Sequence, residues 1–148
     1  MRPTPTIGHD IAYFERGACS FTVCDIGGQR RARTQWARYL SLDEASGQFN
    51  ESHTIVFVVD AANSARLPEA RGELEGLLRD PRLQSIALLV FANKMDIDVA
   101  LPMAEVGDGL GFSQAPSFAR RCCVRGGSTR TGEGVVDVLD WVAASECA

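Results

Sequence analysis

The sequence predicts an α/β domain built around a mostly parallel sheet. Two apolar runs, residues 54–60 (TIVFVVD) and 86–93 (IALLVFAN), lack alternation and are rich in branched side chains, which suits strands buried on both faces. Helical patterns lie between and after them, and alternating strands and amphipathic helices are typical of this class. The chain has 148 residues, of which 45% are hydrophobic and 23% charged, so it fits one domain, residues 1–148, with its own core.

The remaining strands are expected at the two ends of this pattern. Residues 10–25 predict two strands joined by a turn, in which Gly17 can adopt a positive φ without steric cost. Residues 121–125 (RCCVR) are a weaker strand candidate. The polar stretch 41–53 is expected to be a surface loop.

Three segments predict helices. Apolar residues recur at three- and four-residue spacing over 67–78, with Ser64 expected to cap the start and Pro81 to follow the end. Residues 103–110 predict a poorer helix, because its two glycines each cost about 1 kcal/mol relative to alanine. The spacing of apolar residues over 135–142 predicts the last helix.

Composition excludes several classes of protein. The net charge of −4 argues against a nucleic-acid binder, which would need a basic face. No apolar run approaches the length of a membrane span, no secretory signal is visible, and Arg2 stands where N-myristoylation would need glycine. The five cysteines are odd in number and form no CxxC pair, which disfavours a disulfide framework or a zinc site. We therefore expect reduced thiols and a cytoplasmic protein without a membrane anchor in this chain.

The segment Asn93-Lys94-Met95-Asp96 follows a buried strand directly, and ligands of such sheets bind at the carboxyl ends of strands. The Asp96 carboxylate can accept hydrogen bonds from the N1–H and the exocyclic amine of guanine, whereas adenine would leave it unpaired. Asn93 can contact the base or tie neighbouring loops together, and the stem of Lys94 can lie along the base plane. A plain surface turn is the alternative interpretation.

Two further segments could serve a nucleotide's phosphates. In Asp25-Ile26-Gly27-Gly28-Gln29, the Asp25 carboxylate can hold Mg²⁺ through water and the Gly28 N–H can approach a γ-phosphate. Gln29 can orient an attacking water. In Thr4-Pro5-Thr6-Ile7-Gly8, a threonine hydroxyl is an oxygen ligand suited to Mg²⁺. Taken alone, each segment reads as a turn or a proline-containing loop.

In this order, PTIG, SFTVCDIGGQ, IVFVVDA, LLVFANKMD and GEGVVDVLDWV resemble the ADP-ribosylation-factor and factor-like GTPases along nearly the whole chain. The GGQ after Asp25 and the FANK before Met95 are that family's forms of general GTPase motifs. The resemblance implies a small G domain of the P-loop NTPase type, with a mostly parallel central sheet and flanking helices. It also implies a GTP-binding switch that uses GTP or GDP with Mg²⁺ in vesicle trafficking or related membrane processes.

The resemblance also implies roles for individual residues. Thr6 would be the Mg²⁺ ligand of switch I, and Asp25 would hold the ion through water. Gly28 would reach the γ-phosphate, and Gln29 would be catalytic by positioning the water. Guanine would be contacted by Asn93, Lys94, Asp96, Ser128 and Thr129, with the Thr129 backbone N–H facing the guanine carbonyl. The segment RGGSTRTGEG, which carries the last two, departs from the family's usual sequence.

The chain contains no GK[ST] motif, and only five residues precede Thr6. The resemblance therefore implies that the first strand, the P-loop and the first helix are lacking. The P-loop gives backbone N–H groups and a lysine to the phosphates, so impaired nucleotide binding and poor solubility of this incomplete domain are expected. Two interpretations stay open. One is a fragment of a longer protein that hydrolyses GTP when the P-loop is supplied, and the other is a nucleotide-free interaction module derived from a GTPase.

Effectors, an exchange factor and a GTPase-activating protein would bind through switch I, the interswitch hairpin and switch II. His9 and Cys24 stand where large aromatics are usual in the family, while Tyr39 keeps the third aromatic. Because aromatics anchor interfaces, the usual effectors are expected to bind weakly or to differ. The intact form is expected to be cytoplasmic and associated with Golgi or other endomembranes.

Overall fold

The computed structural model describes residues 8–34, 36, 39, 53–112 and 121–146. Two compact units make up the chain, Met1–Gln48 and Phe49–Ala148, and each is described by itself. The expected Mg²⁺ ligand Thr6 and nearly all of the polar stretch 41–53 lie outside the described residues. Within the described part, no helix is long and apolar enough to cross a membrane.

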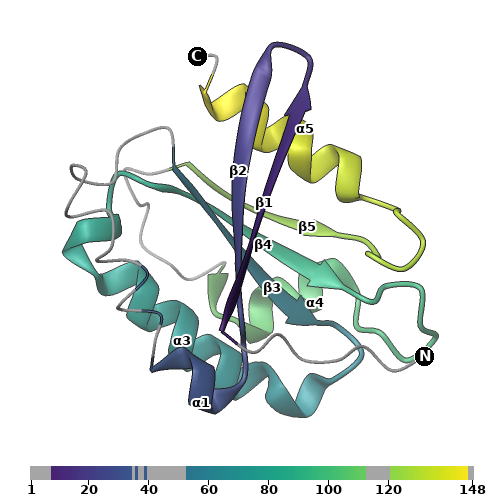
Figure 1. The fold of residues 1–148 in the computed structure, drawn as a ribbon. Helices are drawn as coiled ribbons and strands as arrows, with labels where there is room; N and C mark the ends of the chain where they lie inside the picture. The colour runs from purple at the N-terminus through teal and green to yellow at the C-terminus, as the bar shows by residue number, and fades with distance from the viewer. Residues whose placement is uncertain (1–7, 35, 37–38, 40–52, 113–120, 147–148) are drawn as a thin grey trace. The chain divides into compact units, whose positions relative to one another are not determined.

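The first unit contains an antiparallel hairpin of strands β1 (His9–Arg16) and β2 (Cys19–Ile26) (Figure 1). Gly17 has a φ of 62° in the connecting turn, which confirms the conformation expected there. Phe14 stacks on Phe21, its partner across the hairpin, with ring centroids 4.9 Å apart. A short helix α1 (Arg30–Arg33) follows the second strand.

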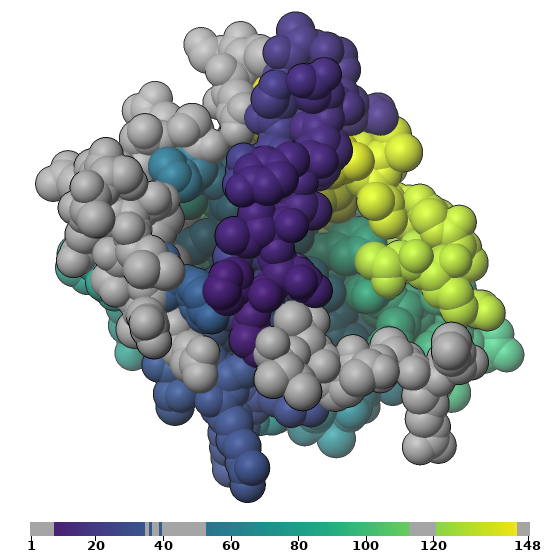
Figure 2. All heavy atoms as spheres, viewed as in Figure 1, coloured from purple at the N-terminus to yellow at the C-terminus, as the bar shows by residue number. Residues whose placement is uncertain are grey.

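Most hairpin residues are exposed, and the side chains seen in purple form an open surface (Figure 2). Three of the exposed residues have large apolar side chains, with exposed fractions of 51% for Ile11, 76% for Tyr13 and 41% for Val23. His9 Nδ1 lies 2.8 Å from the Tyr39 hydroxyl, and the two rings are in contact at 4.8 Å. The hairpin thus presents a mixed apolar and polar surface.

The second unit is built on a parallel sheet with strand order β3-β4-β5. Strand β3 (Thr54–Asp60) pairs with β4 (Ala87–Asn93), which pairs with β5 (Cys122–Gly126). Every residue of β4 before Asn93 is buried, as the unbroken apolar run predicts. The register sets Asp60 beside Asn93, so these strands end at the same level of the sheet.

Helices cover both faces of this sheet (Figure 1). On one face, Val138 of α5 (Val135–Glu146) packs with Leu89 and Phe91 of β4. Helices α3 (Leu67–Arg79) and α4 (Met103–Gly109) contact each other, β3 and β5. Short 3-10 turns η2 (Ser64–Arg66) and η3 (Pro81–Leu83) flank α3. The unit is therefore the flanked parallel α/β sheet that the sequence predicts.

Strand β3 corrects one expectation. The apolar run 54–60 predicts burial on both faces, but Val56 and Val58 are 40% and 58% exposed while Phe57 and Val59 are buried. The register places Val56 and Val58 beside Leu89 and Phe91, on the face that α5 covers. Helix α5 packs over β4, the central strand, so the same face of the edge strand stays open.

Two details of the helices also differ from the sequence reading. The expected cap Ser64 begins η2 instead, and α3 starts at Leu67 with Arg66 in the N-cap position. Of the two glycines expected to weaken α4, Gly109 lies at a close contact, since a Cβ there would be 3.0 Å from Leu67 Cδ1. Glycine therefore lets α4 approach the start of α3.

Candidate functional site

The carboxyl end of β4 turns sharply at Lys94. Its φ of 68° is the one positive value at a non-glycine position among the described residues. The turn is held by the Lys94 backbone N–H, which donates to Asn93 Oδ1 at 2.8 Å, and by the Met95 N–H, which donates to the Gly127 carbonyl at 3.0 Å. A left-handed lysine costs free energy that the surrounding bonds must offset, and such strain gathers at binding sites.

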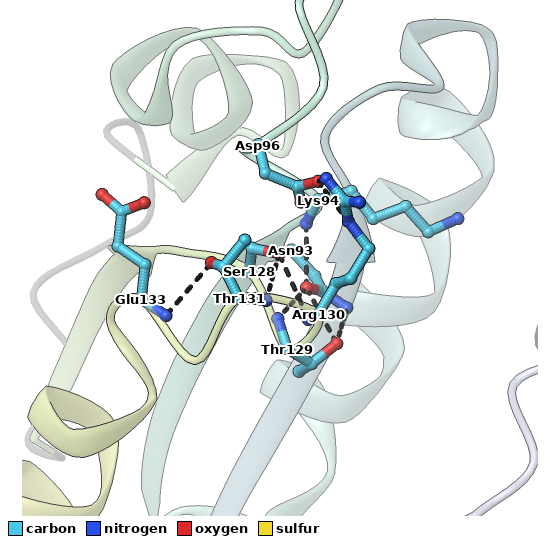
Figure 3. Close-up of polar contacts among 8 residues, drawn as sticks. All are labelled: Asn93, Lys94, Asp96, Ser128, Thr129, Arg130, Thr131 and Glu133. Carbon is cyan, nitrogen blue, oxygen red and sulfur yellow. Dashed lines mark hydrogen bonds and ion pairs between the residues drawn. The ribbon is translucent and has the colours of Figure 1, made fainter.

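Asn93 joins this turn to the loop after β5 (Figure 3). Its Oδ1 accepts from the Thr129 backbone N–H at 3.0 Å, and its Nδ2 donates to the Thr129 hydroxyl at 3.1 Å. Of the two roles expected for Asn93, the structure therefore shows the tie between loops. Thr129 N–H, expected to face a base carbonyl, is engaged by Asn93 here.

Ser128 organises the loop after β5 from a buried position, with 1% of its surface exposed. Its hydroxyl oxygen accepts from the backbone N–H groups of Arg130 and Thr131, at 3.2 and 3.3 Å. Its own N–H donates to the Glu133 carbonyl, which closes the loop. The loop is too tight for a side chain at Gly127, where a Cβ would lie 2.2 Å from the Glu133 oxygen. The unusual segment RGGSTRTGEG thus has a steric reason for Gly127.

The Asp96 carboxylate contacts the Arg130 guanidinium (Figure 3). Arg130 Nε and Nη2 approach the same carboxylate oxygen, Oδ2, at 2.8 and 2.5 Å. The Asp96 side chain is only 9% exposed, whereas that of Arg130 is 78% exposed. Hydrogen bonding from Ser128, and then from Arg130, lowers the pKa of Asp96 below its usual range. The carboxylate is therefore ionised and ready to accept hydrogen bonds at neutral pH.

Lys94 forms an ion pair with the neighbouring strand. Its Nζ lies 2.5 Å from Asp60 Oδ2, and Asp60 Oδ1 accepts from the Ala62 N–H at 3.0 Å. Both side chains are partly exposed. The Lys94 stem is thereby fixed across the ends of β3 and β4, where a planar ligand could lie against it.

The expected phosphate and metal residues fall in the first unit. Asp25 lies exposed near the end of β2, and Gly28 and Gln29 follow it, also exposed. The space around Gly28 is open, since a Cβ built there would meet nothing within 4 Å, and its carbonyl accepts from Arg33 Nε at 2.9 Å. Gln29 is the N-cap of α1, yet its side chain makes no capping hydrogen bond.

The donor types at these positions fit Mg²⁺. The Asp25 carboxylate is a hard oxygen ligand at an exposed strand end, and Thr6 would add a hydroxyl. Among residues 8–34, 36, 39, 53–112 and 121–146, no group of three or more His, Cys, Asp or Glu side chains could hold a metal by itself. One or two protein oxygens, completed by water and substrate phosphates, is the usual way in which proteins hold Mg²⁺.

Two residues of the second unit contact the predicted site residues but were not predicted from the sequence. Asp60 was seen only as the last residue of a strand, although its place at the carboxyl end beside Asn93 was a usable signal. Arg130 carries no motif, and its pairing with Asp96 across 34 positions of sequence follows from the loop's fold. By contrast, the structure does bring together Asn93, Lys94, Asp96, Ser128 and Thr129, all of which the sequence singled out.

Comparisons with known proteins agree with this architecture. The family model described as the ADP-ribosylation factor family matches residues 1–146. The structure is also similar to that of the Arl6 (BBS3) small GTPase from Trypanosoma brucei with the bound nucleotide analogue GppNp. That similarity has a TM-score of 0.82 at 25% identity and covers 97% of this chain and 82% of the other. The chain belongs to the ADP-ribosylation factor family.

Proposed function

We propose that this chain is a guanine-nucleotide-binding switch of the ADP-ribosylation-factor-like type. One observation carries the proposal: the turn after β4 and the loop after β5 are tied together around a nearly buried, ionised carboxylate, Asp96. Carboxyl ends of parallel strands are where such folds bind nucleotides. A structure of the similar Trypanosoma brucei protein has a nucleotide analogue bound.

In this proposal, Asp96 accepts from the N1–H and exocyclic amine of guanine. Lys94, held by Asp60, lies along the base plane, and Ser128 keeps the second loop in shape. Asn93 holds the two loops together, and the Thr129 N–H turns from Asn93 Oδ1 to the guanine carbonyl. Adenine has an acceptor at N1 and no neighbouring amine, so it would leave the carboxylate without its partners.

The phosphate end would be served by residues of the first unit. Thr6 and, through water, Asp25 would hold Mg²⁺, which neutralises phosphate charge when bound. The open backbone at Gly28 would let its N–H donate to the γ-phosphate. Gln29, whose side chain is not used to cap α1, would orient the water that attacks in GTP hydrolysis. Loss of the γ-phosphate contacts would then release the two switch segments, which carry Thr6 and Gly28.

Partner proteins would bind the chain according to its nucleotide state. Effectors, an exchange factor and a GTPase-activating protein are proposed to bind switch I, the hairpin and switch II, in vesicle trafficking or a related membrane process. The exposed Ile11, Tyr13 and Val23 supply apolar contact area on the hairpin. The contact of His9, at the start of the hairpin, with Tyr39, which follows α1, supplies a polar and aromatic site in the same unit.

Base recognition can be tested even where binding is weak, which is expected because the chain contains no GK[ST] segment. The ¹⁵N-labelled chain is titrated with Mg²⁺-GDP and Mg²⁺-ADP, and amide shifts of residues 93–96 and 128–130 are followed. GDP should bind more tightly, and Asp96→Asn should reduce the ratio of GDP to ADP affinity about tenfold or more. Asp98→Asn, two residues away and exposed, is the charge-matched control.

A GDP preference that survives Asp96→Asn unchanged would remove the proposal's basis. If neither nucleotide shifts these amides at millimolar concentration, the second candidate, a nucleotide-free interaction module, takes its place. The exposed apolar side chains of the hairpin are the observation that favours that candidate. It predicts capture of protein partners that depends on Tyr13 and not on nucleotide.

A further inference from the structure

The Arg130–Asp96 pair puts a side chain of the protein in the position where a base would be read. Arg130 offers two neighbouring N–H donors, Nε and Nη2, to a carboxylate that is 9% exposed. Guanine also offers two neighbouring N–H donors to a carboxylate. The guanidinium is thus a chemical substitute for the reading edge of guanine.

The two ligands of Asp96 cannot occupy it fully at once. A carboxylate reads guanine by turning one oxygen to each of the two donors, and in Asp96 one of these oxygens, Oδ2, already accepts from both Arg130 donors. For guanine to be read, the Arg130 side chain must therefore leave. We propose that Arg130 is a specificity-determining residue that competes with guanine for Asp96, an inference that rests on the proposed function.

The loop allows this exchange without unfolding. Arg130 is anchored by its backbone, since its N–H donates to the Ser128 hydroxyl oxygen at 3.2 Å. The side chain itself is 78% exposed, so it can move into solvent while the backbone stays in place. Thr131 N–H is held by the same hydroxyl, which keeps the turn closed on the far side of Arg130.

The competition has opposite consequences for the two purine classes. Guanine must displace Arg130, which lowers its apparent affinity. Adenine makes no use of a carboxylate at this place, so Arg130 can stay and keep Asp96 paired, which removes the penalty that would reject adenine. Arg130 thus narrows the gap between guanine and adenine nucleotides, and its removal should widen that gap.

The test compares the full chain with its Arg130→Gln variant, using Mg²⁺-GDP and Mg²⁺-ADP in NMR titrations. GDP affinity should rise about two- to fivefold in the variant, the range expected when one partly exposed ion pair no longer has to be broken. ADP affinity should stay the same or fall. Arg79→Gln is the matched control, because Arg79 is 81% exposed and pairs with Glu75 near the end of α3 that precedes β4. It should leave both affinities unchanged.

A double-mutant cycle separates competition from a general charge effect. In the Asp96→Asn background, Arg130→Gln should no longer raise GDP affinity, since no carboxylate remains to compete for. Arg130→Lys keeps the charge but offers a point-like ammonium. Its GDP affinity should lie between those of the wild type and the Arg130→Gln variant. Equal or weaker GDP binding by Arg130→Gln than by the wild type would overturn the competition while leaving the proposed function intact. A wild type and a variant that both fail to bind GDP would overturn the proposed function, and the competition with it.

Discussion

Gly134 shows how a single residue shapes the loop that holds Ser128 and Arg130. Its φ is 73°, and a Cβ placed there would lie 2.4 Å from the Gly126 carbonyl oxygen. Gly132 also has a positive φ, 85°, but a Cβ at that position meets nothing within 4 Å. A side chain at Gly132 would therefore meet backbone strain alone, whereas one at Gly134 would meet both backbone strain and a steric clash.

Gly132→Ala should lower the free energy of unfolding by about 1 kcal/mol, since only the left-handed backbone is strained. Gly134→Ala should lower it by about 3 kcal/mol or more, because the clash with backbone adds to the strain. Urea unfolding of the full chain measures both. Equal losses in the two variants would show that the loop shifts to admit the Gly134 Cβ.

The ionisation of Asp96 provides a second test at this scale. Ser128 first, and then Arg130, lowers the pKa of the Asp96 carboxyl in the folded chain. A lowered folded pKa means that the ionised form stabilises the fold fully above the unfolded-state value, and that this is lost as the pH falls through the folded value. Because Ser128, which the proposed exchange leaves in place, makes the largest contribution, Asp96 should stay ionised at pH 5, and the preference for GDP over ADP should persist at that pH. Arg130→Gln should raise the pKa of Asp96 toward its usual range, as measured by ¹³C NMR of the carboxyl carbon.

Asp80 supplies the internal reference for that measurement. Its pKa is also lowered, chiefly by hydrogen bonding from Arg82, and it lies between α3 and η3. Arg130→Gln should leave the Asp80 titration unchanged. If neither carboxyl responds, the Arg130–Asp96 pair contributes nothing to the ionisation of Asp96.

Helix α3 shows what periodicity predicts and what it misses. The spacing of its leucines placed the buried side chains Leu67 and Leu74 correctly, and Pro81 follows its end. The helix begins at Leu67, where the apolar spacing begins, but the expected cap was wrong, because Ser64 is the first residue of η2. The exposed Val56 and Val58 were missed because a run of valines does not say which strand of the sheet lies at the edge.

Two glycines of the helices should respond differently to alanine. Gly76 lies inside α3 with nothing within 4 Å of a Cβ, so Gly76→Ala should stabilise the chain by about 0.5–1 kcal/mol. Gly109→Ala in α4 meets Leu67 Cδ1 at 3.0 Å and should give no gain. Urea midpoints of the two variants check this. A similar gain in both would mean that Leu67 gives way freely.

At the scale of the whole molecule, the sequence predicted the type and order of the elements better than their connection. All strands expected from apolar runs are present, and the residues of the proposed nucleotide site in the second unit lie together because parallel strands end at one edge. The hydrogen bonds of the described residues nevertheless form two separate sheets, β1-β2 and β3-β4-β5. The contact of Arg130 with Asp96 could not be predicted for the same reason that strand pairing could not: both depend on how the fold brings distant segments together.

This division predicts unequal local stability. Strand β4 is bonded on both sides and buried over Ala87–Ala92, so its amides should open only with the whole second unit. The hairpin is two-stranded and mostly exposed, and an isolated hairpin is marginally stable in water. Hydrogen exchange with mass spectrometry should therefore label residues 9–26 at least about a hundredfold faster than residues 87–92. Equal protection of the two segments would mean that the chain opens as one cooperative unit, because only global unfolding would then expose either sheet.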